Sequence, residues 1–331
     1  MGAYIIAEAG VNHNGRLDLA KELCLAAKNA GADCVKFQTW QTEKIITRSV
    51  AQADYQADNT GRAESQFDML KRLELSYDDF RAVKAYCDEI GIQFASTADE
   101  ADSLDFLLTL GIPFIKIGSG ESGNIPYLRY MGSKKKPVLL STGMSSLADV
   151  ELSLEALRQG GAEDITLLHC TTSYPCPYDR VNLRAMDTLR AAFGLPVGYS
   201  DHTEGIAIPT AAAARGAVVI EKHFTLDRHM EGPDHLASTE PEAFRQMVSA
   251  IRQVEAGLGS GCKAPSPEER AISEVVLKRI VAARPIPIGK LLTADDLTVK
   301  RNDRGLSARY WDLVIGTPAR RDYAADDAIE L

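Results

Sequence analysis

Two histidines that follow short apolar segments are the first candidates for chemistry in this chain. His202 ends the segment P-V-G-Y-S-D-H, and His223 ends the later segment A-V-V-I-E-K-H. The residues between them predict a strand, a small-residue helix and a second strand, which together form a βαβ unit. Because a right-handed crossover places the carboxyl ends of parallel neighbours side by side, His202 and His223 should lie close together. A lone histidine is more often structural, but this pair, beside Asp201 and Glu221, predicts a metal site.

Two lysines interrupt otherwise apolar segments and are the second candidates. Lys36 and Lys116 would be costly to bury without a partner. Their expected counter-charges are Glu8, Glu121 and Glu221, or an anionic substrate. Hydroxyl groups and backbone N–H groups near the segment ends favour a phosphate and a carboxylate as ligands. The hydroxyl residues concerned are Ser96, Thr97, Ser119, Ser141 and Thr142. A barrel lysine that forms a Schiff base, as in aldolases, is the alternative at this point.

Eight strand-like segments separated by helical patterns position these residues. They are Tyr4 to Ala9, Cys34 to Thr39, Gln93 to Thr97, Phe114 to Gly118, Val138 to Thr142, Ile165 to Thr171, Val197 to Ser200 and Val218 to His223. Their near-continuous apolar character indicates burial on both faces. Eight βα units in about 260 residues predict an α/β fold, a (β/α)8 TIM barrel, with an open doubly wound sheet as the weaker alternative. Every segment ends in polar residues, and barrel enzymes assemble their sites at that end.

Glycines punctuate the helical patterns. The predicted helix C-caps are Gly31, Gly91, Gly111, Gly132, Gly160 with Gly161, Gly194 and Gly216. The connection from Thr42 to Ser76 is unusually long, which is typical of a lid or substrate loop, with disorder as the competing interpretation.

The amino-acid composition of the chain changes after the last predicted helix of the barrel. We expect a catalytic barrel over residues 1–260, a Gly- and Pro-rich linker over residues 261–276 and a small β-rich domain over residues 277–331. A domain this small is marginally stable alone and is expected to dock on something.

The composition of the chain argues against a nucleic-acid-binding protein and a membrane-spanning protein. The 331 residues carry a formal charge of −9 and are 45% hydrophobic and 25% charged. An acidic chain lacks the footprint of a nucleic-acid binder, and no apolar run is long enough for a membrane span. The N-terminus shows no secretion signal, and the six scattered cysteines are typical of reduced thiols, so a cytoplasmic location is expected.

Ordered motifs over the whole barrel closely resemble the sialic acid synthase family. They are E-A-G-V-N-H-N-G (8–15), V-K-F-Q-T (35–39), K-I-G-S-G-E (116–121), L-S-T-G-M (140–144), L-H-C-T-T-S-Y-P (168–175), G-Y-S-D-H-T (198–203), I-E-K-H-F-T (220–225) and G-P-D-H (232–235). The tail, with V-K-R at 299–301, resembles the antifreeze-like (SAF) domain of that family.

The resemblance implies a metal-dependent condensation of phosphoenolpyruvate with an N-acylated amino sugar, usually N-acetylmannosamine, with release of phosphate by C–O cleavage. It implies that His202 and His223 bind Mn²⁺ or Mg²⁺, and that Glu121, Glu221 and Lys116 are catalytic. The residues implied to bind phosphoenolpyruvate are Lys36, Gln38, Thr97, Lys116, Ser119, Ser141, Thr172 and Ser200. Those implied to bind the sugar are Glu8, Asn59, Tyr174, Asp234 and Arg301.

The family also implies a homodimer in which the tail of one chain caps the barrel of the other, so that Arg301 acts in trans. Two positions depart from the family pattern. Thr172 stands where some members carry asparagine, and N-D-R-G follows Arg301 where many members have a Pro-Gly turn, which makes Arg304 a rival for the arginine role.

N-acetylneuraminate synthesis is the leading interpretation of the sequence. The alternative within the family is a legionaminate or pseudaminate synthase that uses a 2,4-diacetamido-trideoxyhexose through the same chemistry. A Schiff-base aldolase and a non-enzymatic antifreeze-like protein on an inert barrel are the remaining alternatives.

Overall fold

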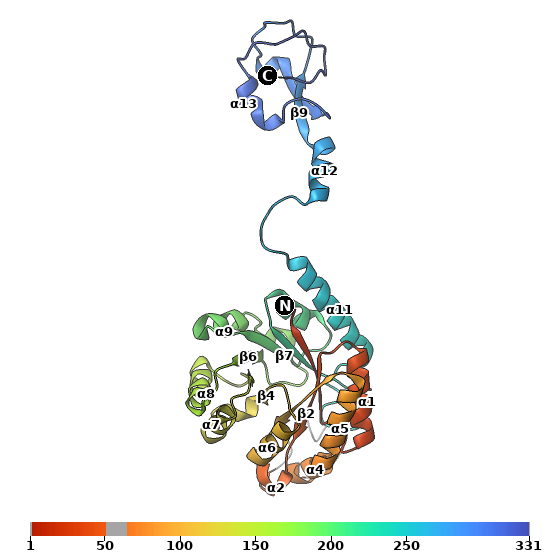
Figure 1. Cartoon of the computed structure of the whole chain (residues 1–331), viewed down its shortest axis with the longest axis vertical. Helices are drawn as coiled ribbons and strands as arrows, with labels where there is room; N and C mark the ends of the chain where they lie inside the picture. Colours follow the sequence, from red (N-terminus) through yellow and green to blue (C-terminus); the bar gives the residue numbers. More distant parts are fainter. Residues whose placement is uncertain (1, 51–64, 331) are drawn as a thin grey trace. The chain divides into compact units, whose positions relative to one another are not determined.

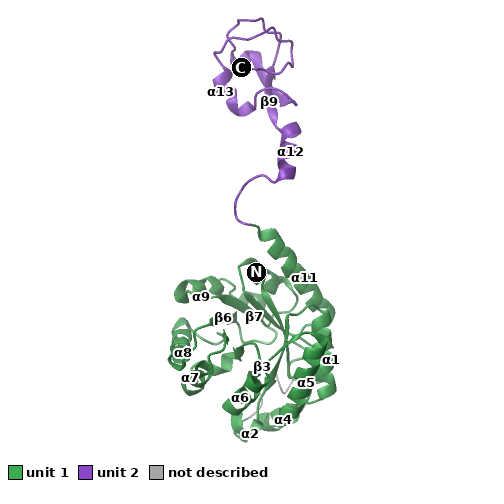
Figure 2. Cartoon of the chain, in the orientation of Figure 1, with its two compact units in different colours: residues 1–259 green, residues 260–331 purple. Residues whose placement is uncertain are grey.

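A computed structural model describes residues 2–50 and 65–330 of the chain. The chain divides into two compact units, residues 1–259 and residues 260–331 (Figure 1; Figure 2). The boundary falls at the start of the Gly- and Pro-rich run. The predicted linker 261–276 contains a helix, α12 (Pro267–Val276), which begins at a capping box formed by Ser266 and Glu269.

Unit 1 is built on a closed barrel of eight parallel strands, which confirms the predicted TIM barrel and excludes the open sheet. The strands pair in chain order, and β1 pairs with β8 to close the barrel. They are β1 (Tyr4–Gly10), β2 (Cys34–Thr39), β3 (Gln93–Ala98), β4 (Ile115–Ile117), β5 (Val138–Ser141), β6 (Ile165–Cys170), β7 (Val197–Asp201) and β8 (Val219–His223). Nearly all of their residues are buried, as expected for strands covered on both faces.

Helices surround these strands in Figure 1. The helices of unit 1 are α1 (Leu17–Asn29), α2 (Thr42–Ile45), α4 (Gln66–Leu73), α5 (Tyr77–Ile90), α6 (Ala101–Thr109), α7 (Ile125–Ser133), α8 (Leu147–Gly160), α9 (Ala185–Phe193), α10 (Ala207–Ala214) and α11 (Pro241–Leu258). Capping boxes at Ser76 and Ser146 begin α5 and α8, because each serine accepts the N–H three residues later while an aspartate bonds back.

Two of the glycines predicted as helix C-caps lie inside helices instead. Gly132 lies inside α7 and Gly160 inside α8, rather than beyond the helix ends. A Cβ added to Gly132 would lie 2.2 Å from the carbonyl oxygen of Leu157, and one added to Gly160 would lie 2.2 Å from that of Arg129. These glycines therefore allow α7 and α8 to pack backbone against backbone. Gly161 supplies the left-handed C-cap of α8.

The interior of the barrel changes from apolar to polar along the strands. A separate apolar cluster fills its amino-terminal half, and its members are Ile6, Cys34, Ala95, Phe114, Leu139, Leu168 and Val219. Because strand side chains alternate between faces, the residue two positions later on each strand points the same way. Those residues are Glu8, Lys36, Thr97, Lys116, Ser141, Cys170 and Glu221. The strand period thus delivers the polar side chains to the carboxyl end of the barrel.

Unit 2 confirms the predicted small domain with an antiparallel sheet. Strands β9 (Lys278–Ala282) and β10 (Leu297–Arg301) pair antiparallel, and a short helix, α13 (Trp311–Val314), follows. Its apolar core is Ile280, Ala282, Ile286, Leu292, Leu297, Val314, Ala319, Tyr323 and Ile329.

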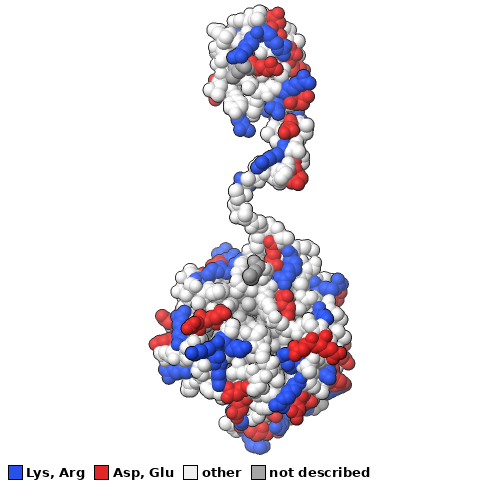
Figure 3. Space-filling model, viewed as in Figure 1, with Lys and Arg blue, Asp and Glu red and all other residues white. Residues whose placement is uncertain are grey.

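Surface charge on unit 1 is mixed. On the face drawn in Figure 3, Lys and Arg side chains alternate with Asp and Glu side chains. Over the described part of the chain, every helix is too short or too polar to span a membrane.

Candidate active site

Two buried lysines and a shared carboxylate form the centre of the polar half of the barrel. The Nζ of Lys36 lies 2.6 Å from Oε2 of Glu8 and 3.9 Å from Oε2 of Glu221. The Nζ of Lys116 lies 3.6 Å from Oε1 of the same Glu221. Glu221 therefore stands between the two ammonium groups, as the expected counter-charge of both lysines. Glu121, the third expected partner, makes no ion pair with either lysine among the described residues.

Hydroxyl groups complete this cluster. Lys36 donates to Oγ1 of Thr97 at 3.0 Å, and Lys116 donates to Oγ of Ser141 at 2.8 Å. Ser200 donates to Oε1 of Glu221 at 3.2 Å. The lysine and hydroxyl donors come from β2, β3, β4, β5 and β7, and the acceptor Glu221 comes from β8. The arrangement can bind an anion, since charge-assisted hydrogen bonds from lysine and hydroxyl groups are among the strongest available.

The pKa values of these groups respond to burial and to each other. Burial raises the pKa of Glu8 to about 7, although Lys36 opposes the rise. Burial also lowers the pKa of Lys116. Burial opposes the charge of Lys36 too, but Glu221 and Glu8 outweigh that effect and raise its pKa. For Glu221, Lys116 and Lys36 outweigh burial and lower the pKa, so this carboxylate stays ionised.

A second set of small polar groups lies at the ends of β4, β5 and β6. The N–H of Gly143 donates to Oγ of Ser119 at 3.0 Å, and that hydroxyl also contacts Sγ of Cys170 at 3.1 Å. A Cβ added to Gly143 would lie 2.4 Å from Oγ1 of Thr172 and 2.7 Å from Oγ of Ser119. The structure thus brings Thr172 and Ser119 together, and the crowding explains why a glycine occupies position 143.

The two histidines lie side by side, as their strand positions predict. Their ring centroids are 5.4 Å apart, and the ring of Tyr174 lies 4.2 Å from that of His202. The Nδ1 of His202 lies 2.7 Å from the carbonyl oxygen of Thr171. Because a carbonyl only accepts, Nδ1 carries the proton and Nε2 keeps its lone pair. Burial lowers the pKa of both imidazoles, so both are neutral.

This geometry fits a divalent metal ion. Ligating histidines usually donate their second ring nitrogen to a carbonyl or carboxylate, as His202 does. The Nδ1 of His223 is buried and has no hydrogen-bond partner among the described residues. Within residues 2–50 and 65–330, no third His, Cys, Asp or Glu joins the pair in a ligand cluster.

A cavity of about 180 Å³ adjoins His223 and Tyr174. Its polar lining is Gln38, Tyr174, His223 and Asp234, and its apolar lining is Val11, Met69, Leu70, Leu73 and Pro233. Gln38 donates to Oε1 of Glu8 at 3.2 Å, and burial raises the pKa of Asp234 to about 6. A Cβ on Gly10, whose φ is +52°, would meet Glu8, Gln38 and Asp234 within 4 Å. The cavity suits a ligand with hydroxyl or amide groups on one side and alkyl groups on the other.

The sequence of this barrel matches a known protein family. The model of the NeuB family matches residues 23–263. The chain belongs to the NeuB family. The SAF domain matches residues 279–330 of this NeuB chain, within unit 2.

Named relatives and solved structures agree with this assignment. The NeuB chain is 45% identical to an N,N'-diacetyllegionaminic acid synthase of Legionella pneumophila, over 96% of this chain and 90% of that protein. It is 44% identical to the protein of the same name from Campylobacter jejuni, over 98% of both. A crystal structure of N-acetylneuraminic acid synthetase from Leptospira borgpetersenii is 31% identical, with a TM-score of 0.73, covering 83% of this chain and 91% of that one.

Three expected site residues are not part of the cluster of lysines and carboxylates in unit 1: Glu121 has another partner, Arg301 belongs to unit 2, and Asn59 is not described. Glu121 ends a short 3-10 helix, η1 (Ser119–Glu121), and accepts from Nδ2 of Asn124 at 2.6 Å, while burial raises its pKa. Arg301 ends β10 in unit 2 and is exposed, and its rival Arg304 contacts Asp303. Asn59 lies outside the described residues.

Sequence reasoning missed Asp99, which follows β3 at the mouth of the NeuB barrel. Burial raises the pKa of Asp99 to about 7, and the carboxylate of Glu121 adds to the rise. Strand alternation could have found this residue, because Asp99 comes two positions after Thr97.

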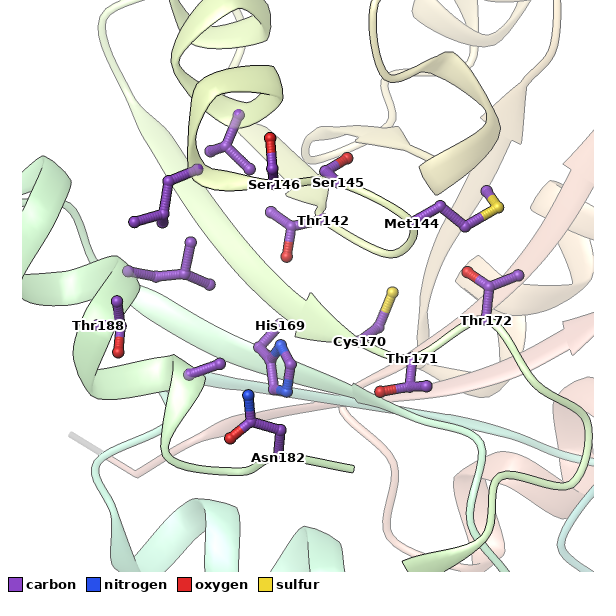
Figure 4. A pocket seen from close by; sticks show the side chains of 14 residues that line it. Thr142, Met144, Ser145, Ser146, His169, Cys170, Thr171, Thr172, Asn182 and Thr188 are labelled. Carbon is purple, nitrogen blue, oxygen red and sulfur yellow. The ribbon is translucent and has the colours of Figure 1, made fainter. Parts of the chain in front are cut away.

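A larger cavity, of about 470 Å³, borders the second set of polar groups, because Cys170 and Thr172 line it. Figure 4 shows it between Met144 and Thr172 on one side and Thr188 on the other, with His169 and Cys170 at its base. It contains neither the two lysines nor the histidine pair. The smaller cavity is lined by His223 and Gln38, so it is the one next to the histidine pair.

Proposed function

We propose that this chain condenses phosphoenolpyruvate with 2,4-diacetamido-2,4,6-trideoxymannose to give N,N'-diacetyllegionaminate and phosphate. The observation that carries the condensation is the pair of buried lysines around Glu221, ringed by hydroxyl groups and next to His202 and His223. The choice of acceptor rests on the two legionaminic acid synthases, which are more similar to this chain than the neuraminic acid synthetase structure is. These relatives favour the diacetamido-trideoxy sugar as the acceptor over N-acetylmannosamine, which the sequence motifs alone favour.

Phosphoenolpyruvate carries a phosphate and a carboxylate, and it matches the donors at the bottom of the site. Lys36 and Lys116 counter its charge, while Thr97, Ser141 and Ser200 donate hydrogen bonds. Ser119, Thr172 and the N–H of Gly143 hold further oxygens. Gln38 lies between this set and the sugar cavity.

The acceptor occupies the cavity lined by Tyr174 and Asp234, with Glu8 beside it. The polar side binds hydroxyl and amide groups of the sugar. The apolar side, with Met69, Leu70 and Leu73, suits a sugar that has fewer hydroxyl groups and carries extra methyl groups. N-acetylmannosamine, with more hydroxyl groups, leaves this side less well matched and is the second candidate.

A divalent ion held by His202 and His223 would supply Lewis acidity to the aldehyde oxygen of the open-chain sugar. Two imidazole ligands favour a transition ion such as Mn²⁺ over Mg²⁺.

The electron pair of the C2–C3 double bond of phosphoenolpyruvate joins carbon 3 to the sugar aldehyde carbon, and the aldehyde oxygen takes a proton to become a hydroxyl group. Positive charge then develops on carbon 2, where water adds before phosphate leaves by C–O cleavage. Glu121, whose raised pKa places it nearer neutrality, takes the proton of that water. Glu221 balances the charge of the two lysines throughout.

The SAF domain completes the site in this proposal. Arg301 reaches the N-acyl group of a sugar bound to the other chain of a homodimer, since the small domain is expected to dock. Six free thiols, five of them buried, are compatible with a cytoplasmic enzyme.

The decisive experiment is the mass of the product. The full chain is incubated with phosphoenolpyruvate and Mn²⁺, with each sugar in a separate reaction, and with and without EDTA. We expect an EDTA-sensitive nine-carbon keto acid, formed faster from the trideoxy sugar. Preference for N-acetylmannosamine would establish the second candidate.

One observation favours a different reaction class. The lowered pKa of Lys116 is a property of lysines that form Schiff bases. Borohydride treatment in the presence of pyruvate tests this: a mass increase on Lys116 together with EDTA-resistant turnover would replace the condensation with an aldolase.

A further inference from the structure

Asp201 and Lys222 form a buried ion pair that the proposed reaction does not use. Their side chains are 0% and 1% exposed, and Nζ of Lys222 contacts Oδ2 of Asp201. Both belong to the strand ends that carry the histidines: Asp201 immediately precedes His202, and Lys222 immediately precedes His223.

Hydrogen bonds hold both members of the pair in place. Oδ1 of Asp201 accepts from the hydroxyl of Tyr199 at 3.0 Å. The same oxygen accepts from the N–H of Thr203 at 3.0 Å and from its hydroxyl at 2.8 Å. Lys222 also donates to the carbonyl oxygen of Thr203 at 2.7 Å. The network therefore ties β7, β8 and the first residue after His202 into one unit.

The pair occupies the last rung between β7 and β8. Asp201 and Lys222 are register partners, and the preceding rung joins Ser200 to Glu221. Because side chains alternate, the two rungs project to opposite faces of the barrel wall. Ser200 bonds Glu221 on the inner face, and Asp201 bonds Lys222 on the outer face. The strand ends are thus linked on both faces directly before the two histidines.

General stability is a poor reason for such a pair. The cost of removing two charges from water often exceeds the attraction between them, and apolar residues would cover this face as well. An ion pair with directed hydrogen bonds adds geometric restraint instead. The ion pair restrains β7 and β8 directly before His202 and His223, whose imidazole rings must stay close enough to bind the same ion.

We propose that the Asp201–Lys222 pair is a positioning device that sets the separation of His202 and His223 and hence the affinity of the site for a divalent ion. This inference rests on the metal site of the proposed function. Neither residue belongs to the metal site or the substrate sites of the proposed function, since both side chains project to the outer face of the barrel wall.

The test measures Mn²⁺ binding to the full chain by calorimetry, and free Mn²⁺ by electron paramagnetic resonance. Asp201→Asn keeps the shape and the acceptor oxygen but leaves Lys222 without its counter-charge. We expect its Kd for Mn²⁺ to rise about 10- to 100-fold, the usual effect of losing a residue that supports a metal ligand. Activity should recover in part when Mn²⁺ is raised to saturation.

Asp33→Asn is the matched control. Asp33 links elements at the opposite end of the barrel, where Oδ2 accepts from the N–H of Ile5 at 2.7 Å and from Arg252 at 3.1 Å. We expect this variant to lose thermal stability and to keep its Mn²⁺ affinity.

Each outcome has a defined meaning. A folded Asp201→Asn chain with wild-type Mn²⁺ affinity would overturn the positioning role while leaving the metal site intact. A wild-type chain that binds no Mn²⁺ would overturn both. If Asp201→Asn does not fold, Tyr199→Phe removes one donor to Asp201 and keeps the ring. A severalfold rise in its Kd supports the proposal, and an unchanged Kd refutes it.

Discussion

The ammonium group of Lys36 lies 2.6 Å from a carboxylate oxygen of Glu8, and both side chains are almost inaccessible to water. Lys36→Met would leave Glu8 and Glu221 buried without this counter-charge. Loss of the charge-assisted contact between Lys36 and phosphoenolpyruvate, worth about 1.5–3 kcal/mol, should lower kcat/KM for phosphoenolpyruvate roughly 10- to 100-fold. Steady-state kinetics measure the loss. Lys44→Met, which removes an exposed ion pair with Asp102, is the control and should stay near wild type.

Removal of either histidine should abolish metal-dependent turnover. His202→Ala and His223→Ala each delete one predicted ligand, so the loss should exceed the roughly 10- to 100-fold effect of losing a supporting residue. Circular dichroism should show an intact fold, and metal analysis should show reduced Mn²⁺. His229→Ala, at an exposed position, should behave as wild type. Normal turnover by a verified metal-free double variant would refute the assignment.

Leu70 is the member of the apolar cavity wall that is only partly buried. Leu70→Asn should reduce the preference for the trideoxy sugar over N-acetylmannosamine by about 10-fold, since one alkyl contact is worth about 1–3 kcal/mol. The ratio of kcat/KM values for the two sugars measures this. Leu152→Asn, an exposed site on α8, should leave the ratio unchanged. An unaltered ratio in Leu70→Asn would mean that this wall does not select the acceptor.

We expect the stability of unit 2 to depend on pH through Asp296. Its side chain is fully buried, and hydrogen bonds from Lys290 and Thr293 lower its pKa below the usual range. Its contribution is therefore present above the unfolded pKa of about 3.9 and is lost as the pH falls toward the folded value. Asp296→Asn should reduce hydrogen-exchange protection in residues 278–330 near pH 6. That deficit should shrink between about pH 5 and pH 2.

Asp295→Asn provides the comparison for that experiment, because Asp295 is exposed and adjacent. It should match wild type throughout. A constant deficit for Asp296→Asn at every pH would show that the carboxylate charge has no part in it.

The SAF domain should act between chains. Deletion of residues 277–331 should abolish efficient turnover, and mixing that truncated chain with full-length Arg301→Ala should not restore it, because neither supplies a working arginine. Mixing the truncated chain with full-length His202→Ala should restore activity, since one provides the barrel and the other the cap. Activity assays of co-refolded chains distinguish these results. Full turnover by the truncated chain alone would contradict the capping role.

The sequence by itself determined the barrel fold and showed that the polar side chains lie at the carboxyl ends of its strands. The apolar residues Ile6 and Val219 are followed two positions later by Glu8 and Glu221, and strand period 2 carries each polar residue to the same end. Parallel crossovers likewise bring His202 and His223 together. These are local rules of strand geometry, so residue order is enough to apply them.

Only the tertiary structure decided which polar groups become partners. Closure of the barrel pairs β1 with β8, and the register of these strands brings Glu8 and Glu221 to Lys36. The register of β7 and β8 placed Asp201 against Lys222 on the outer face. The 3-10 helix η1 left Glu121 with Asn124 instead of a lysine. Such pairings depend on distances between strands far apart in the chain, and no pattern within a single strand contains them.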